Sequence, residues 1–184
     1  MKWNFISYGT ICVACVLIFI FFPASLLAFS GELLAKGEVW RFFTFTFTHT
    51  SFYHLIQNLI ALTIVTILLF ELEVESHFKP FISSSWIVAG IAAIILPTML
   101  MAGASVGVYG LLGFAAMSSV VFIPRMISVP LFGGAILLDA LIEYFRTSVF
   151  NTPQLTLHLG GYICGIAIFS IVKLLKRKKY VLKR

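Results

Sequence analysis

The sequence contains little charge for its length. Only 11% of its 184 residues are Asp, Glu, Lys or Arg, whereas 60% are apolar and the mean hydropathy is +1.05. Soluble domains contain about 25% charged and about 45–50% apolar residues. A chain with so few charges has too little polar surface to cover its apolar residues in water. The composition therefore excludes a soluble globular domain and predicts a protein that crosses a membrane several times.

Cysteine and histidine are also scarce, and their scarcity excludes several kinds of site. Cys12, Cys15 and Cys164 lie in apolar segments, where an odd number gives no disulfide framework and small buried side chains are expected. The four histidines include no His-Glu-x-x-His pair, so we expect no metal site. A phosphate-binding glycine-rich loop and nucleic-acid motifs are absent as well. We therefore expect neither a cofactor nor a nucleic-acid partner.

Most of the positive charge is concentrated near the C-terminus. Seven of the 13 Lys and Arg residues lie between Lys173 and Arg184, and they account for the net charge of +6. Such a cluster beside an apolar segment is typical of a cytoplasmic flank that lies near anionic lipid. The basic balance therefore indicates a partner in the lipid bilayer.

Six apolar segments predict six membrane-spanning helices in one domain, residues 1–184. We expect helices at about 3–29, 52–70, 83–101, 105–123, 127–145 and 153–175, and a basic tail at 176–184. The first segment is too long for a cleaved signal peptide and has no Ala-x-Ala site. Pro97 is expected to kink or end the third helix.

The number of spans and the positive charges predict the orientation. Six spans leave both termini on one side, where ten Lys and Arg residues would lie against three on the other. Lys and Arg are enriched on the cytoplasmic side of membrane proteins. We therefore expect a multi-pass integral protein of the bacterial inner membrane with both termini in the cytoplasm.

One stretch, Gly103 to Gly113, combines four glycines with a single serine. Glycines at such spacing allow membrane helices to approach closely. Ser105 falls on the first turn of the fourth segment, beside the unpaired N–H groups and the positive end of the helix. This position can stabilise a developing negative charge. Capping of the helix is the alternative role for Ser105.

Three more polar residues fall at a similar membrane depth. At about 1.5 Å per residue from the predicted cytoplasmic ends, His158 lies roughly 22 Å, His54 roughly 25 Å and Asn58 roughly 20 Å into the membrane. The same count places Ser105 at up to about 30 Å. Polar groups inside a membrane usually face a cavity or one another. The four residues therefore predict a site in the outer half of the membrane.

The residue types predict the chemistry of this site. Serine becomes a nucleophile when a base removes its proton, and His158 is the base at the appropriate depth. The Ser105 amide, the His54 ring and the Asn58 amide are candidate donors for an oxyanion. Packing is the alternative role for His158, and hydrogen bonding between helices is the alternative for Asn58. Asp139 is either a third residue that orients His158 or a carboxyl group that pairs locally or stays protonated.

Four motifs carry a resemblance to a known family. They are Trp40-Arg41, then His49-x4-His54-x3-Asn58, then Gly103-x-Ser105 with Tyr109, Gly110 and Gly113, and finally His158-x2-Gly161-x3-Gly165. In this order and at this spacing they resemble the rhomboid family of intramembrane serine proteases. The resemblance implies a six-helix membrane bundle whose active site lies below the outer surface and whose substrates are transmembrane segments of other proteins.

The resemblance also implies roles for individual residues. Ser105 is the nucleophile and His158 the general base of a Ser–His dyad. His54, Asn58 and the Ser105 amide form the oxyanion hole. The remaining matched positions support the site: Tyr109 beside the His158 ring, Gly103, Gly161 and Gly165 in the helices, Trp40 and Arg41 in the first loop, and His49 as the residue that holds this loop.

Two positions depart from the family pattern. The residue after the serine is usually glycine and is Val106 here, and the residue before the last histidine is usually alanine and is Leu157 here. Both substitutions affect how closely the fourth and sixth helices approach. The alternative function is therefore a catalytically inactive rhomboid-like protein that binds membrane clients. A transporter is a third class, but the inverted repeats typical of transporters are absent from the sequence.

Overall fold

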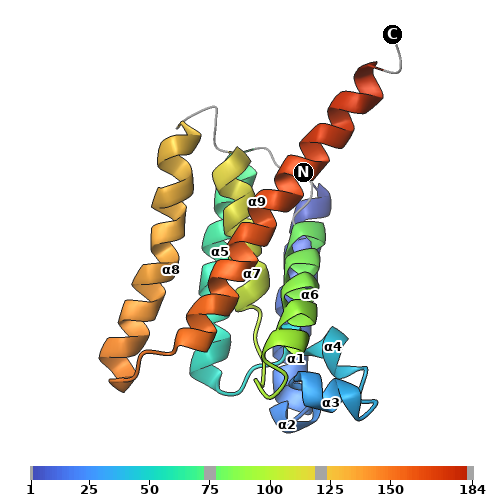
Figure 1. The fold of residues 1–184 in the computed structure, drawn as a ribbon, viewed down its shortest axis with the longest axis vertical. Helices are drawn as coiled ribbons and strands as arrows, with labels where there is room; N and C mark the ends of the chain where they lie inside the picture. The colour runs from blue at the N-terminus through green and yellow to red at the C-terminus, as the bar shows by residue number, and fades with distance from the viewer. Residues whose placement is uncertain (1, 73–77, 119–123, 182–184) are drawn as a thin grey trace.

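The computed structural model describes residues 2–72, 78–118 and 124–181, and apart from one isolated β-bridge their regular elements are all helices. The elements are α1 (Lys2–Phe21), α2 (Ala24–Leu27), α3 (Gly31–Ala35), α4 (Arg41–Thr44), the 3-10 helix η1 (Phe45–Phe47), α5 (Phe52–Glu71), α6 (Phe78–Ile95), α7 (Ser105–Ser118), α8 (Arg125–Thr147) and α9 (Thr152–Val181). Figure 1 shows the long helices as one bundle, with α2, α3 and α4 grouped at one end.

The described helices are consistent with six spans. Helices α5, α6 and α8 and residues Thr152–Leu175 of α9 are long and apolar enough to cross a membrane. Two shorter apolar segments, Ile6–Phe21 and Ser105–Ser118, belong to α1 and α7. Helix α1 begins, and α9 ends, at the end of the bundle opposite α2–α4 (Figure 1). The fold is therefore that of an all-α membrane protein.

Prolines move two helix ends away from the predicted boundaries. Helix α1 ends at Phe21 instead of near residue 29, because Pro23 is extended and α2 starts after it. Helix α6 starts at Phe78, since Pro80 is tolerated in a first turn, and it ends at Ile95 shortly before Pro97. The predicted end of the fourth helix at residue 123 and the last residues of the basic tail, 182–184, lie outside the described residues.

Helix α7 is the centre of the bundle. It packs against α5, α6, α8 and α9, and ten of its 14 residues are buried. Its glycines bring α9 especially close: a Cβ at Gly113 would overlap the Tyr162 carbonyl, and one at Gly165 of α9 would overlap the Gly110 carbonyl. Such close backbone contact is the usual result of small residues between membrane helices. The α7–α9 interface sets the distance between the residues that these two helices carry.

The segment before α7 is fixed to the first loop. Phe29 and Met101 exchange two backbone hydrogen bonds, of 2.9 and 2.7 Å, and the Gly103 N–H donates to the Phe45 carbonyl at 3.0 Å. Phe29, Phe45 and Met101 are also buried in one apolar cluster. The start of α7 is therefore held in position from both sides of the chain.

Candidate functional site

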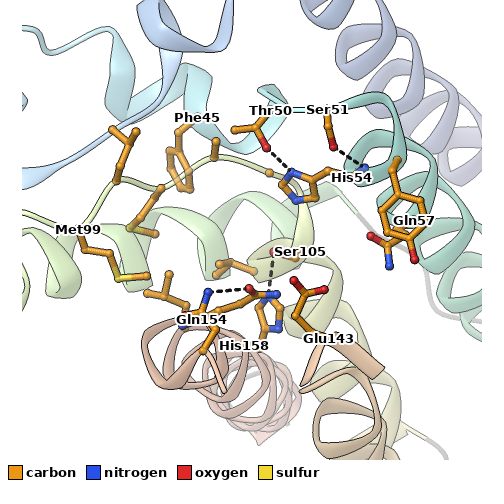
Figure 2. Close-up of a pocket in the computed structure, with 18 of the residues that line it drawn as sticks. Phe45, Thr50, Ser51, His54, Gln57, Met99, Ser105, Glu143, Gln154 and His158 are labelled. Carbon is orange, nitrogen blue, oxygen red and sulfur yellow. Dashed lines mark hydrogen bonds between the residues drawn. The ribbon is translucent and has the colours of Figure 1, made fainter. Parts of the chain in front are cut away.

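Ser105 and His158 form a hydrogen-bonded pair between the two most closely packed helices. Ser105 is the first residue of α7, and its Oγ lies 3.0 Å from Nε2 of His158 on α9. His158 is only 5% exposed, whereas Ser105 is half-buried. Figure 2 shows the two side chains facing each other. A close serine–histidine pair of this kind has the geometry of a nucleophile and its base.

The other ring nitrogen of His158 faces a carboxylate. Oδ2 of Asp139, on α8, lies 3.2 Å from Nδ1 of His158. The Asp139 side chain is 35% exposed, so the ion pair is at the edge of the buried site. Tyr109 lies on another side of the ring, with ring centroids 4.5 Å apart and planes inclined by 35°. Contacts from three helices therefore fix the orientation of the imidazole.

His54 and Asn58 lie on α5, on the opposite side of Ser105. Ser51 caps α5 and accepts a hydrogen bond from the His54 backbone N–H at 3.1 Å, and Thr50 Oγ1 lies 3.3 Å from Nδ1 of the His54 ring. Asn58 is buried, and its Nδ2 donates to the His54 carbonyl at 2.9 Å. The second N–H of the Asn58 amide is left for another acceptor.

Gly103 brings the chain past the His54 ring. It has φ +122°, a conformation that other residues rarely adopt, and a Cβ there would lie 2.7 Å from Nε2 of His54. Asn58 Nδ2 is 3.9 Å from the same point. Glycine is therefore needed at this position to bring the start of α7 against the two α5 side chains.

Two cavities meet at the serine. One of about 330 Å³ is lined mainly by polar groups, among them Thr50, His54, Glu143, Gln154 and the Ser105–His158 pair (Figure 2). The other, of about 250 Å³, lies between α5, α7 and α8, and its lining is largely apolar. Ser105 and His158 contribute to both cavities. The pair is therefore accessible from a polar space and also from an apolar one.

The first loop is held together by Arg41. This residue is 6% exposed, its Nη1 donates to the carbonyls of Ser25 and Ala28, and its Nε is 2.6 Å from the carboxylate of Glu38. Trp40 is half exposed and donates from its indole N–H to the Leu26 carbonyl at 3.2 Å. Both residues lie in the first loop, as predicted, and their contacts are within the loop.

His49 joins this loop to α5. Its Nδ1 is 3.2 Å from the Phe47 carbonyl, and its ring centroid is 5.1 Å from that of His54. Burial lowers the pKa of His49 from 6.5 to about 4, and the nearby His54 acts in the same direction. His49 is therefore neutral at pH 7 and supports His54 by packing.

Several residues around the serine were not predicted from the sequence. Thr50 and Ser51 position His54, and the signal that identifies them is a pair of hydroxyl residues directly before an apolar helix. Gln154 and Glu143 line both cavities. Each is four residues from a residue of the site, His158 and Asp139 respectively, so the spacing along one helix face identifies them. No group of three metal-binding side chains is found among the described residues.

Comparison with known proteins agrees with the motifs. A family model described as the rhomboid domain matches residues 36–174, which is more than half of the chain and includes every site residue described above. A comparison with curated proteins gave no match. The extent of the domain match, together with the all-helical membrane fold, shows that the chain belongs to the rhomboid family.

Proposed function

We propose that this protein is an intramembrane serine endopeptidase that cleaves transmembrane segments of other membrane proteins. The observation that carries the proposal is the 3.0 Å contact between Ser105 Oγ and His158 Nε2, within apolar helices and at the edge of a polar cavity. A serine and a histidine that served only in helix packing would have no need of an adjoining space for substrate and water. Membership of the rhomboid family supports the same activity.

The reaction begins with proton transfer from Ser105 to His158. As Ser105 Oγ attacks the carbonyl carbon of the scissile peptide bond, Nε2 of His158 takes the hydroxyl proton. The same nitrogen then donates this proton to the leaving amine, and an acyl-enzyme remains on Ser105. Water enters from the polar cavity, His158 removes its proton, and the ester bond breaks to restore Ser105.

The tetrahedral intermediate requires hydrogen-bond donors for its oxyanion. The amides of residues 105–107 precede the first backbone hydrogen bond of α7, from Val108 N–H to the Ala104 carbonyl. They are at the positive end of the helix. The His54 ring and the second N–H of Asn58 approach from α5 across Gly103. The oxyanion hole in this proposal consists of the Ser105 amide, His54 and Asn58.

The surroundings of Ser105 suggest how a substrate enters. An apolar segment in a membrane is helical, and its peptide bonds are protected by their own hydrogen bonds. The apolar cavity between α5, α7 and α8 accepts such a segment, and the polar cavity beside it provides hydrogen-bonding groups for a locally unwound strand. The proposed location is the bacterial inner membrane with both termini in the cytoplasm, so cleavage occurs in the outer half of the membrane.

The test is cleavage of a single-pass membrane substrate by the full-length protein in detergent and in liposomes. We expect Ser105→Ala and His158→Ala to abolish cleavage without loss of the folded protein. Loss of one oxyanion donor, as in Asn58→Ala, lowers the rate on the order of 10²–10³-fold. A fluorophosphonate probe labels the wild-type protein and does not label the Ser105→Ala variant. Undiminished cleavage by Ser105→Ala would disprove the proposal, and a wild type that binds substrates without cleaving them would indicate the client-binding alternative.

A further inference from the structure

The carboxylate of Asp139 is the feature of the site that a Ser–His dyad does not use. It lies 3.2 Å from Nδ1 of His158, on the side of the ring opposite to the nitrogen that meets Ser105. Among the side chains that the structure describes, no Lys or Arg forms an ion pair with Asp139. Glu143, one turn further along α8, is instead bonded to Arg146 at 2.6 Å. The two carboxylates of α8 thus have different partners.

The contact determines which nitrogen of His158 carries the proton. A neutral imidazole has one N–H and one lone pair, and Ser105 loses its proton only to a lone pair on Nε2. A carboxylate beside Nδ1 accepts a hydrogen bond from that nitrogen, so it favours the tautomer with the proton on Nδ1. When His158 takes the serine proton, the ring becomes positively charged and the adjacent negative charge stabilises it.

From this geometry we infer that Asp139 is a positioning residue that completes a Ser105–His158–Asp139 triad in this protein. Asp139 holds the ring and its tautomer and remains ionised throughout the reaction, while the proton moves only between Ser105, His158 and the leaving group or water. The inference rests on the proposed protease function for its kinetic test. The tautomer itself is independent of that function and is measured separately.

Asp139→Asn is the appropriate change because it keeps the size of the side chain. The amide of asparagine donates to Nδ1, which moves the ring proton to Nε2 and removes the lone pair that Ser105 needs. In a soluble triad the same exchange lowers kcat about 10⁴-fold. Because Asp139 is about one-third exposed and water partly replaces it, we expect a loss of about 10–10³-fold here. Asp139→Glu restores the carboxylate and recovers part of the rate.

Ser128→Ala is the matched control for simple loosening of α8. Ser128 is fully buried on the same helix, far from the cavities, and its hydroxyl donates to the Ala116 carbonyl of α7 at 2.8 Å. Its loss weakens the attachment of α8 without touching His158. We expect Ser128→Ala to lower the thermal midpoint while the folded fraction reacts with the fluorophosphonate probe at close to the wild-type rate.

The experiment measures probe-labelling rate, kcat, KM and thermal midpoint for the wild type and the three variants in detergent and in liposomes. A triad predicts that Asp139→Asn lowers labelling and kcat together, with KM within about twofold and an unchanged midpoint. Wild-type labelling by Asp139→Asn would overturn the inference. It would also be overturned if the rate loss of Asp139→Asn followed a fall in midpoint and Ser128→Ala lost the same rate.

The tautomer of His158 gives a second readout that does not need activity. In protein labelled with ¹⁵N-histidine, the His158 signals, identified by their loss in His158→Gln, show the proton on Nδ1 in the wild type and on Nε2 in Asp139→Asn. An unlabelled wild type with this tautomer change would refute the protease proposal and leave the positioning role intact. The same tautomer in both proteins would overturn the role of Asp139 even in an active protease.

Discussion

Val106 follows the proposed nucleophile, and its replacement by glycine tests whether the site is packed for activity. The side chain is 3% exposed and belongs to an apolar cluster that contains Phe45, Val88, Met101 and Leu157. Its Cγ1 lies 3.3 Å from the point that a Cβ of Gly161 would occupy. A large side chain on α7 thus meets a glycine on α9, and Ser105 and His158 are within 3.0 Å with both Val106 and Leu157 in place.

The magnitude of the change follows from this packing. Val106→Gly removes three buried carbon atoms, and if α7 and α9 do not close over the space, the cavity costs on the order of 2 kcal/mol. Glycine in the first turn of the helix adds about 0.5–1 kcal/mol of backbone freedom in the unfolded chain. Partial collapse lowers the sum, so we expect a loss of about 1–3 kcal/mol. Activity then stays level or falls.

The measurement is the thermal midpoint and the cleavage rate of the wild type, Val106→Gly and Leu157→Ala in detergent and in liposomes. Val106→Ala is the matched control, because it removes two of the three carbons and leaves the backbone preference of an ordinary residue. If the valine instead held the helices apart, Val106→Gly would relieve overpacking by a similar 1–3 kcal/mol and raise activity. An inactive wild type that either Val106→Gly or Leu157→Ala makes active would refute our reasoning and favour the client-binding alternative.

Three further predictions concern Gly103, His49 and the substrate. Gly103→Ala combines a strained φ with contact against His54, so we expect at least a tenfold loss of cleavage rate, whereas Gly37→Ala, which has positive φ but no neighbour within 4 Å, lowers the midpoint alone; equal rates in both variants would argue against this role of Gly103. His49 has a pKa of about 4 in the folded protein, so its contribution to stability is complete above pH 6.5 and is lost as the pH falls toward 4. The unfolding free energy of the wild type relative to His49→Gln should therefore fall by about 2 kcal/mol between about pH 7.5 and about pH 5, and a constant difference would contradict the buried neutral histidine. Replacing Gly or Pro residues near the outer end of a substrate helix with Ala and Leu should slow cleavage, and an unchanged rate would show that local unwinding does not select substrates.

The sequence predicted the depth of the candidate site because the rise of a helix per residue is fixed. Ser105, His54, Asn58 and His158 were placed in one layer by counting residues from charged ends, and the structure brings Ser105 and His158 into hydrogen-bond contact. Asn58 is four residues after His54, and its side chain reaches the backbone carbonyl of that residue. Spacing along one helix was therefore sufficient to group these two residues.

Contacts between distant segments could not be predicted in the same way. Arg41 fixes the first loop through the carbonyls of Ser25 and Ala28, which are 16 and 13 residues earlier in the chain. No local pattern marks those carbonyls as its partners. The early end of α1 at Phe21 depends in part on this loop, although Pro23 was visible in the sequence as a local signal.

Asp139 shows the limit of a depth argument most directly. Depth gives the position of a residue along the membrane normal, but it does not give the direction in which the side chain points around the helix axis. For His158 this direction is set by glycines that bring α7 and α9 into backbone contact, and those glycines are visible in the sequence. Helix α8 has only two buried residues, Ser128 and Ile136, among its 23. Its rotation is fixed by a few polar contacts, such as the Ser128 hydroxyl on the Ala116 carbonyl, and by the Asp139–His158 pair itself. The residue that the sequence left undecided is therefore carried by the helix whose packing the sequence determines least.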